Sequence, residues 1–339
     1  MKQIKTKDAV GHVLCHDITR IVRGVTKDAE FRKGHVVTEK DIPALLSLGK
    51  ENLYVWEPQK GMLHENDAAE ILYSICAGEN MSPSEVKEGK IESIADCSGI
   101  FLVDKERLRA INSLGELAIA TRHSGFPVQK GDKLAGARAI PLLISEEKMA
   151  KARAIGHSVP LLALRPFSPK KIALINTGSE VFYGRIQDTF SPVIEEKAKE
   201  YGAAVFSKIT MPDMPEEITK GILDMIQKGA DMVICTGGMS VDPDDRTPLA
   251  IKNTGAEIVS YGAPVLPGSM FMLSYYEGKI PVLGLPGCVM YAKRTIFDLV
   301  LPKLMADIPV TAENLAALGH GGLCLNCETC TYPNCGFGK

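Results

Sequence analysis

The second half of the chain alternates short apolar runs with amphipathic stretches. The runs KIALINT (171–177), AAVFSKIT (203–210) and DMVIC (231–235) have the length of strands. Continuous apolar strands of this kind occur in parallel sheets that helices cover on both faces. Because amphipathic stretches follow each run, residues 168–306 are predicted to form an α/β domain, a three-layer αβα arrangement around a mostly parallel sheet.

Four stretches in this domain have apolar residues at helical spacing. They are predicted as helices over residues 187–201, 214–229, 244–255 and 289–306. The third begins with acids and has Pro248 in its first turn, which is a helix-start pattern. Alternating strands and helices place every strand end at a loop, where side chains are free to bind ligands.

The first half of the chain has a less regular pattern. Residues 1–58 predict a β-rich subdomain with one short helix, which starts after Thr38 as N-cap and stops at Gly49. Residues 59–167 mix strand-like and helix-like runs and predict an α+β subdomain. The stretch LRPFSPKK (164–171) has two prolines and is typical of a linker to the αβα domain.

Composition excludes several classes of function. The 39 Lys and Arg residues nearly balance the 41 Asp and Glu residues, so no overall basic excess is available for nucleic acid. No run of about 18 apolar residues predicts a membrane span, and the N-terminus lacks the apolar core of a signal peptide. A cytoplasmic protein without nucleic-acid or membrane partners is expected, and its five scattered cysteines are expected to be buried thiols.

Glycine-containing motifs follow two of the predicted strands. In TGGMSVDPDD the residues Thr236, Gly237, Gly238 and Ser240 come directly after a strand. Glycines let a ligand approach the backbone, whose amides cradle anions, and a following helix adds its positive end. This loop is predicted to bind an anion such as a phosphate.

Three aspartates lie just beyond these glycines, at positions 242, 244 and 245. A carboxylate repels a phosphate, so the two are compatible only if a divalent cation such as Mg²⁺ bridges them. The alternative is that the acids cap the following helix and offset its dipole. Helix capping is preferred for Asp244, and Mg²⁺ binding for Asp245.

The first strand of the domain ends in a similar loop. In NTGSEVFYGRIQDT, Thr177 and Gly178 close the strand, Glu180 follows, and Asp188 opens the next helix. Strand ends of a parallel sheet meet at one edge. The two loops are therefore predicted to share one pocket.

These motifs resemble the molybdopterin-binding domain that molybdopterin molybdotransferases, molybdopterin adenylyltransferases and CinA-type proteins share. The segments that carry the resemblance are NTGSEVFYGRIQDTFSPVIEEKAKEYGA, VICTGGMSVDPDDRTPLAI and GLPGCVMYAKRTIFDLVLPKL. The resemblance covers residues 168–306 and implies that molybdopterin binds at the carboxyl edge of the sheet. It also implies Mg²⁺ and a reaction in which molybdate is inserted as the nucleotide of adenylylated molybdopterin leaves.

Several residues match the motifs of that family individually. Glu180 falls on its TGxE glutamate and Asp245 on its acidic position, and these two are the implied catalytic residues. The implied ligand-binding residues are those of the first loop and the glycine-rich loop together with the LPG motif: Thr177, Gly178, Asp188, Thr236, Gly237, Gly238, Ser240, Pro286 and Gly287.

The chain also departs from the molybdotransferase pattern. Cys288 and Val289 stand where Asn-Pro usually follows LPG, the first region lacks a PxxxSxxDGYA-like segment, and no β-barrel pattern follows residue 306. Metal insertion is the first hypothesis. The alternatives are a carrier or sensor of molybdopterin without turnover and a CinA-like nucleotide hydrolase. A molybdoenzyme or cofactor-biosynthesis partner and a homo-oligomer are further expectations from the resemblance.

The last segment, residues 307–339, has a pattern of its own. It places Cys324, Cys327, Cys330 and Cys335 within twelve residues, in a C-x2-C-x2-C-x4-C order. Such crowding is typical of metal binding. The first three cysteines resemble half of a ferredoxin motif for a [4Fe–4S] cluster, although the fourth is one residue late, and Zn²⁺ held by four thiolates is the alternative.

Overall fold

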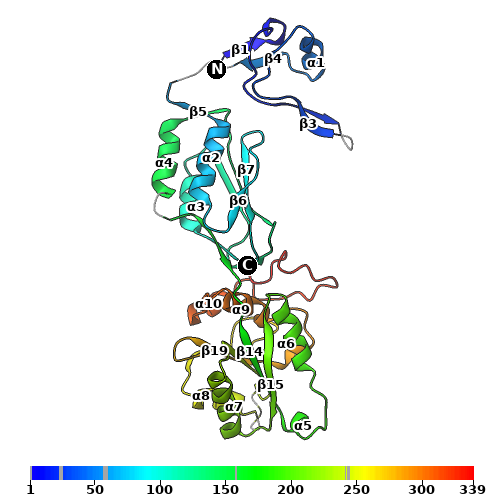
Figure 1. Ribbon diagram of the computed structural model, residues 1–339, viewed down its shortest axis with the longest axis vertical. Coiled ribbons are helices and arrows are strands. Elements are labelled where there is room, and N and C mark those ends of the chain that lie inside the picture. Colours follow the sequence, from blue (N-terminus) through cyan, green and yellow to red (C-terminus); the bar gives the residue numbers. More distant parts are fainter. Residues whose placement is uncertain (1, 23–25, 56–59, 157–158, 241, 243–244) are drawn as a thin grey trace. The chain divides into compact units, whose positions relative to one another are not determined.

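The computed structural model describes residues 2–22, 26–55, 60–156, 159–240, 242 and 245–339. Contacts divide the chain into two compact units (Figure 1). Unit 1 comprises Met1–Ile94, Asp104–Arg122 and Lys133–Leu162, and unit 2 comprises Ala95–Val103, His123–Asp132 and Ala163–Lys339. Three segments of the predicted 59–167 subdomain thus group with unit 2: residues 95–103, 123–132 and 163–167. The bounds of the four predicted domains stay predictions.

Unit 1 begins with short antiparallel pairs around a small core. Its elements here are β1 (Lys2–Lys5), η1 (Thr6–Asp8), β2 (Ile18–Val22), β3 (Thr26–Phe31), α1 (Asp41–Ser47) and β4 (Asn52–Val55). Strand β1 pairs with β4, and β2 pairs with β3. The core beneath them is formed by Ala9, Leu14, Ile18, Val37, Leu45 and Leu53.

The short helix of this region starts later than the sequence predicts. Thr38 is not its N-cap; the N-cap is Lys40, which makes no side-chain cap bond. The physical reason is that the Thr38 backbone N–H and hydroxyl both donate to the Asp41 carboxylate, at 2.8 Å each, and so form a turn before the helix. The end of the helix before Gly49 agrees with the prediction.

The rest of unit 1 is an antiparallel sheet with helices. Its elements are β5 (Met62–His64), α2 (Glu65–Cys76), β6 (Met81–Pro83), β7 (Lys90–Ala95), α3 (Lys105–Asn112), β9 (Leu117–Thr121), β11 (Lys133–Ala139), β12 (Leu143–Ser145) and α4 (Glu146–Gly156). The sheet has the order β6-β7-β11-β9. Helix α2 buries Ala68, Leu72 and Ile75, which lie three or four residues apart on one face. The predicted α+β N-terminal region is confirmed.

Unit 2 contains the predicted mostly parallel sheet. Its six strands are β14 (Lys171–Thr177), β15 (Ala204–Met211), β16 (Met232–Thr236), β17 (Glu257–Tyr261), β18 (Met272–Tyr276) and β19 (Ile280–Leu285). They lie in the order β15-β14-β16-β19-β18-β17. The first four are parallel, and β18 and β17 add to the edge antiparallel. The mostly parallel sheet is confirmed.

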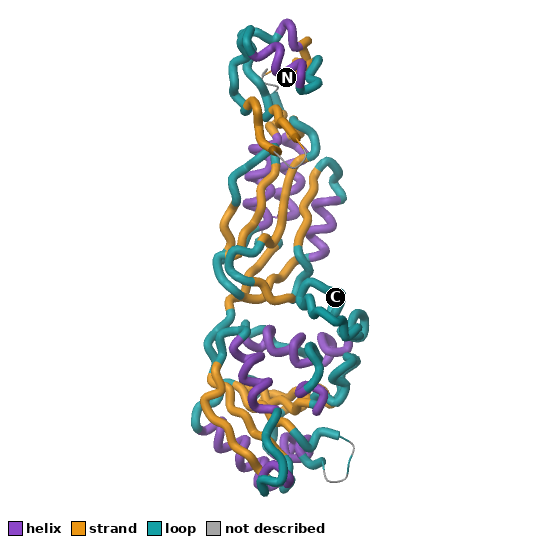
Figure 2. The backbone as a smooth tube through the Cα atoms, turned by 90° about the vertical axis from the view of Figure 1, so that its right-hand side faces the viewer, coloured by secondary structure: helices purple, strands orange, loops and turns teal. Residues whose placement is uncertain are grey.

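Helices cover both faces of this sheet (Figure 2). They are α6 (Phe190–Lys199), α7 (Pro215–Gln227), α8 (Thr247–Asn253), α9 (Ile296–Met305) and α10 (Ala312–Ala317). The short helix α5 (Ser179–Phe182) follows β14 and buries no residue. Successive residues of β16 point to opposite layers: Ile234 packs with α6 and α9, and Val233 packs with α7 and α8. Both faces of the central strands are therefore buried, which explains their continuous apolar sequences.

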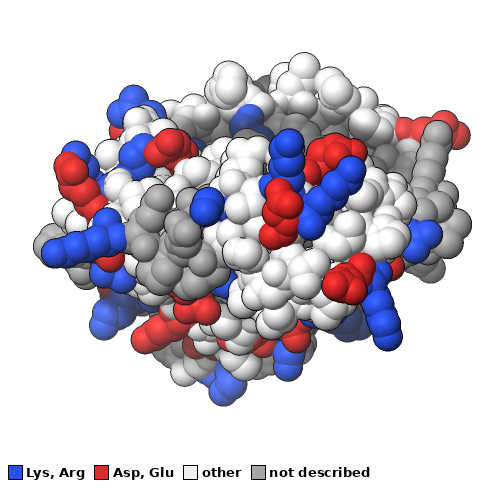
Figure 3. Space-filling model, turned by 90° about the horizontal axis from the view of Figure 1, so that it is seen from above, with Lys and Arg blue, Asp and Glu red and all other residues white. Residues whose placement is uncertain are grey.

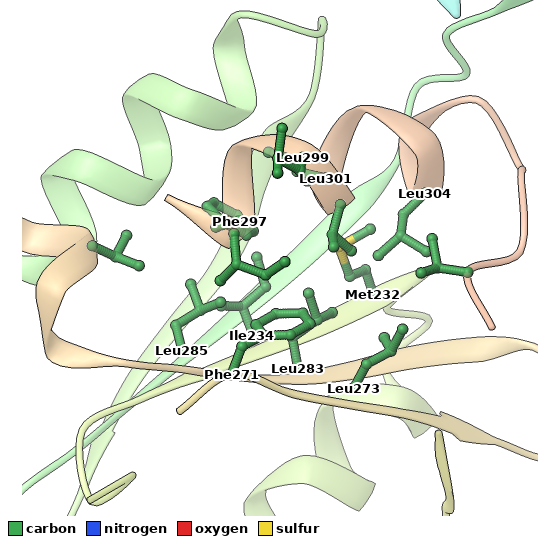
Figure 4. Close-up of a cluster of buried hydrophobic side chains, with 14 of the residues drawn as sticks. Met232, Ile234, Phe271, Leu273, Leu283, Leu285, Phe297, Leu299, Leu301 and Leu304 are labelled. Atoms are coloured by element: carbon green, nitrogen blue, oxygen red, sulfur yellow. The ribbon is translucent and has the colours of Figure 1, made fainter. Parts of the chain in front are cut away.

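The larger core lies between the sheet and α9 (Figure 4). Strand residues such as Ile234 and Leu283 meet Phe297 and Leu301 of α9, and all four are fully buried. A second, three-stranded sheet of unit 2 has the order β10 (Phe126–Val128), β8 (Gly99–Val103), β13 (Leu162–Pro166). Helix α9 also contacts β8 and β10 of that sheet. This helix is thus surrounded by packed elements.

The last long helix is shorter than predicted. The sequence predicts one helix over 289–306, but residues Gly287–Met290 form the 3-10 turn η2 and α9 begins at Ile296. The reason is a capping box: Thr295 caps the helix, while the Asp298 carboxylate accepts from the Thr295 backbone N–H at 2.7 Å. The predicted helix over 187–201 likewise begins later, at Phe190.

Two general properties agree with the sequence. Positive and negative side chains are interspersed on the face shown in Figure 3, with neither sign gathered in one area among the coloured residues. In the part of the chain that the structure describes, no helix combines the length and apolarity that crossing a bilayer requires.

A buried ionic cluster holds α6, α9 and the loop before α9 together. The Asp298 carboxylate, 2% exposed, accepts from Lys197 Nζ at 2.6 Å and from the Arg294 guanidinium at 2.8 Å. The same carboxylate caps α9 through Thr295. Removing it would leave the ammonium of Lys197, which is 7% exposed, without its ionic partner.

We expect Asp298→Ala to lower the free energy of unfolding by about 3–5 kcal/mol, because it leaves a buried positive charge uncompensated. Denaturant unfolding of the full chain measures this change. The control is Glu195→Ala, which breaks the half-exposed pair of Glu195 with Lys208 and should cost about 0–1 kcal/mol. Equal losses for both variants would contradict the assigned role of Asp298.

Candidate functional site

A cavity of about 580 Å³ opens at the carboxyl ends of β14 and β16. Its lining comes from the loops after these two strands and after β15, from the start of α6 and the loop before it, and from the turn η2. The lining residues are Asn176, Thr177, Gly178, Glu180, Val181, Ile186, Gln187, Asp188, Thr189, Phe190, Asp213, Gly237, Gly238, Ser240, Asp242, Asp245 and Met290. This is the edge of a parallel sheet at which ligands bind.

The cavity brings together most of the residues that the sequence singles out. Those that line it are Thr177, Gly178, Glu180, Asp188, Gly237, Gly238, Ser240 and Asp245. Thr236, Pro286 and Gly287 do not line it. Thr236 is fully buried beneath the lining, and its hydroxyl donates to Asn176 Oδ1 at 3.0 Å. Met290, three residues after Gly287, is the residue of that turn that reaches the cavity.

The two glycines after β16 are explained by packing between the loops. Gly237 and Gly238 have φ values of 86° and 56°. A Cβ on Gly237 would lie 2.2 Å from the Thr177 carbonyl oxygen, and one on Gly238 would lie 2.7 Å from Thr247 Oγ1. These glycines therefore allow the loops to approach each other, and the space that the sequence assigns to a ligand is taken by protein atoms on that side.

Threonine hydroxyls connect the two strand-end loops. Thr177 Oγ1 donates to the Thr236 carbonyl at 3.1 Å and lies 2.9 Å from Thr247 Oγ1. The Thr247 backbone N–H donates to the Gly238 carbonyl at 3.2 Å. Since Thr177, Thr236 and Thr247 are all buried, this network holds the floor of the cavity in place.

Asn176 is a cavity residue that the sequence reasoning missed. Its side chain is 1% exposed, and its Oδ1 accepts from Thr236. Its Nδ2 is buried and has no hydrogen-bond partner among the described residues. A buried donor without a partner is costly, so it points to an acceptor that a bound ligand supplies. The signal in the sequence was a polar residue at the end of an apolar strand, directly before Thr177.

Some carboxylates of the cavity already accept hydrogen bonds from backbone N–H groups. Asp188 accepts from the backbone N–H groups of Phe190 and Ser191, at 2.9 and 3.0 Å, and so caps α6. Asp245 Oδ2 accepts from the Ser240 N–H at 2.7 Å, which removes that amide from the predicted anion cradle. Helix capping accounts for Asp188, and Asp245 keeps its second oxygen for a ligand.

Two further acids line the cavity beside the predicted ones. Asp213, which the sequence reasoning missed, accepts from the Ser179 N–H at 2.7 Å and so fixes the loop that bears Glu180. The Glu180 side chain is exposed, as is that of Asp242. Asp244, the predicted helix cap, lies outside the described residues.

The charge of the cavity is one-sided. Five of its lining residues are Asp or Glu, and none of the described lining residues is Lys, Arg or His. The charged side chains that a phosphate meets there are all negative, so its binding favours a divalent cation between the carboxylates and the phosphate oxygens. The lining residues offer the carboxylates that Mg²⁺ prefers, and among the residues that the structure describes no three of these acids are already grouped around one ion position.

Cys288 follows the LPG motif but does not line the cavity. It is half-buried, and burial raises the pKa of its thiol. Of the scattered cysteines, Cys15, Cys76 and Cys235 are buried as expected, whereas Cys97 is half-buried. Burial raises the pKa of Cys235 to about 12, so this thiol stays protonated at neutral pH.

The four cysteines of the C-terminal segment differ in exposure. Cys324 and Cys335 are half-buried, and Cys327 and Cys330 are exposed. In the described ranges, no group of three or more His, Cys, Asp or Glu side chains is arranged to hold a metal ion. The predicted metal site is therefore not preformed around a single ion.

Family models match two parts of the chain. Residues 173–306 match the model described as a probable molybdopterin binding domain. Residues 3–57 match a domain of unknown function. The first match has nearly the bounds of the predicted αβα domain and contains every lining residue of the cavity.

Curated proteins with related sequences cover parts of the chain. A protein of Pyrobaculum calidifontis is 37% identical over 163 residues, which are 44% of this chain and 60% of that protein. A molybdopterin molybdenumtransferase of Synechococcus elongatus is 24% identical over 49% of this chain and 44% of its own length. A CinA-like protein of Thermosipho melanesiensis is 37% identical over 33% of this chain and 28% of its own length. The chain thus spans less than two thirds of the length of each of these relatives.

Among solved structures, the molybdopterin biosynthesis enzyme MoaB of Thermus thermophilus aligns with 41% of this chain and 98% of its own, at 23% identity and a TM-score of 0.34. The family match rests on the sequence of residues 173–306, and the cavity at the strand ends lies within it. Residues 173–306 of this chain are thus similar to the family described as probable molybdopterin binding domains.

Proposed function

We propose that the strand-end cavity binds molybdopterin or adenylylated molybdopterin together with Mg²⁺, for insertion of molybdenum or tungsten into the cofactor. The observation that carries the proposal is the buried Asn176 amide without a partner in a cavity lined by five acids. The family match over residues 173–306 supports the pterin as ligand. The similarity to a molybdopterin molybdenumtransferase supports the reaction class.

The phosphate of the ligand is assigned to the floor of the cavity. There the N–H groups of Asn176 Nδ2 have no acceptor among the described protein groups. We assign a phosphate oxygen as their acceptor. A hydrogen bond to a charged phosphate oxygen contributes about 1.5–3 kcal/mol and removes the cost of an unpaired buried donor. Asn176 is held for this role by Thr236, which donates to its Oδ1.

Mg²⁺ is assigned to the acids on the other side of the cavity. Glu180 is exposed and Asp245 presents the oxygen that Ser240 does not use. When bound there, Mg²⁺ supplies positive charge that lets carboxylates and phosphate lie close together and stabilises a nucleotide as it leaves. Asp213 keeps Glu180 in position through the Ser179 amide. Molybdate or tungstate is the substrate in this scheme.

We expect Asp245→Asn to reduce Mg²⁺-dependent binding of adenylylated molybdopterin at least about tenfold, because it removes one charge from the cation's ligands. Calorimetric titration with and without Mg²⁺ measures the loss. Asparagine keeps an oxygen for the Ser240 amide, so the loop should stay folded. Glu257→Gln, on the surface of β17, is the control and should bind like the wild type. Unchanged affinity of the Asp245 variant would remove this residue from the site.

We expect Asn176→Asp to weaken the same ligand about 10–100-fold, because the donor is replaced by a carboxylate that repels phosphate. The carboxylate still accepts from Thr236, and a parallel thermal melt shows whether the fold is retained. The loss should appear for pyrophosphate as well as for the pterin, since the phosphate carries the interaction. A folded variant with wild-type affinity would contradict the assigned role of Asn176.

A carrier or sensor of molybdopterin without turnover is the second candidate. It is favoured by the match to the molybdenumtransferase, which covers 44% of that enzyme's length. In this role the cysteine segment serves docking to a molybdoenzyme or a redox response. Release of AMP from adenylylated molybdopterin by the purified full chain, dependent on Mg²⁺ and molybdate, would rule out the carrier. Hydrolysis of a free nucleotide would instead indicate a CinA-like activity.

A further inference from the structure

A second cavity, of about 270 Å³, lies beside the loop that precedes α9. All four cysteines of the C-terminal segment line it: Cys324, Cys327, Cys330 and Cys335. Lys293, Arg294 and the apolar side chains of Leu323, Tyr332 and Phe337 form much of the remaining wall. None of these residues lines the strand-end cavity, so the two cavities are separate.

The cysteine segment is anchored at several points within unit 2. Phe337 is 4% exposed and belongs to the larger core. The Tyr332 hydroxyl donates to the Asp298 carbonyl at 2.9 Å, and the Cys324 N–H donates to the Leu266 carbonyl at 2.8 Å. Gly338 N–H donates to the Gly321 carbonyl at 2.9 Å. The backbone before and after the cysteines is thus fixed to the rest of unit 2 by hydrogen bonds and by the buried Phe337.

Two positively charged side chains, Lys293 and Arg294, lie in the wall of the cavity together with the four cysteines. Lys293 Nζ donates to the carbonyls of Cys327 and Glu328, at 3.0 and 2.6 Å. The Arg294 guanidinium lies 5.0 Å from the centre of the Tyr332 ring. Four thiolates around a metal centre bring excess negative charge into a partly apolar cavity. The Lys293 ammonium in the wall offsets part of that charge, whereas Arg294 is already paired with Asp298 and Glu200.

We propose that these four cysteines bind a [4Fe–4S] cluster in this cavity. A cubane cluster takes one thiolate at each of its four irons, so its ligands surround a volume. A single Zn²⁺ requires all four sulfurs about 2.3 Å from one point, which is a smaller arrangement than the ligands of a cubane form. Within the described part of the chain, no three His, Cys, Asp or Glu side chains are already arranged around a metal ion, so the cysteines must shift to bind either group. The volume of the cysteine cavity, about 270 Å³, is far larger than the roughly 10–15 Å³ needed for one water molecule, so the cavity has room for a group of several atoms.

The exposure of the ligands fits this assignment. Cys327 and Cys330 are exposed and Cys324 and Cys335 half-buried, so the cluster would lie near the surface with one side covered by Leu323, Tyr332 and Phe337. Exposed thiols that approach a metal from solvent are deprotonated on binding. Assembly therefore releases four protons as four iron–sulfur bonds form to the preassembled cluster, and no oxidant or reductant is consumed.

The test begins with the full chain purified without oxygen and then incubated with equal amounts of ferrous and ferric iron and with sulfide, which together supply the oxidation level of a dithionite-reducible [4Fe–4S] cluster. We expect about four irons and four acid-labile sulfides per chain, with a visible absorption band that bleaches when dithionite reduces the cluster. One equivalent of zinc that iron and sulfide do not displace would overturn the proposal. Absence of bound iron after this treatment would overturn it equally.

Substitutions then locate the cluster. Cys327→Ser and Cys330→Ser remove exposed thiols, so the fold should be retained, and each variant should lose most of the iron and the absorption band. Cys97→Ser, a half-buried cysteine of unit 2 outside the segment, is the control and should keep the full iron content. Wild-type iron content in the double variant Cys327→Ser/Cys330→Ser would overturn the proposal. Pterin binding is not needed for any of these measurements, so their outcome is independent of the strand-end cavity.

Discussion

The parallel pairing of β14 with β16 is the constraint on which the candidate site depends. The register sets Asn176 opposite Thr236, so the two strands end at the same level. Thr236 then donates to Asn176, and Thr177 donates back to the Thr236 carbonyl. A shift of one residue would turn these side chains to the opposite face of the sheet, and the cavity floor would be lost.

The same register explains why glycine follows β16. With Asn176 opposite Thr236, the Thr177 carbonyl lies so close to Gly237 that any Cβ would collide with it. Glycine at position 237 therefore allows the two strand-end loops to pack against each other. Its effect on ligand binding is indirect, because this packing forms the floor of the cavity. The acids around the floor keep their places through backbone amides, as Asp245 does with Ser240 and Asp213 with Ser179.

One short segment connects the two cavities of unit 2. Met290 lines the strand-end cavity, and Lys293 and Arg294, three and four residues later, line the cysteine cavity. The segment is held at its end by Asp298, which binds Arg294 and Lys197 and caps α9 through Thr295. The buried ionic cluster thus supports both sites: it fixes the end of α9 and, through the Asp298 carbonyl, the ring of Tyr332.

By itself the sequence determined the class of fold and most of the cavity. Apolar strands and amphipathic helices at regular spacing specify a covered parallel sheet, because such strands can be buried only between two helical layers. The glycine and acid motifs are local, so their positions at strand ends followed from the same pattern. Tertiary structure decided the rest: that Asn176 is left with an unpaired donor, that Asp188 is used as a cap, that Thr236 is buried, and that Lys293 and Arg294 face the cysteines. These features depend on contacts between segments far apart in the chain, and no local periodicity records such contacts.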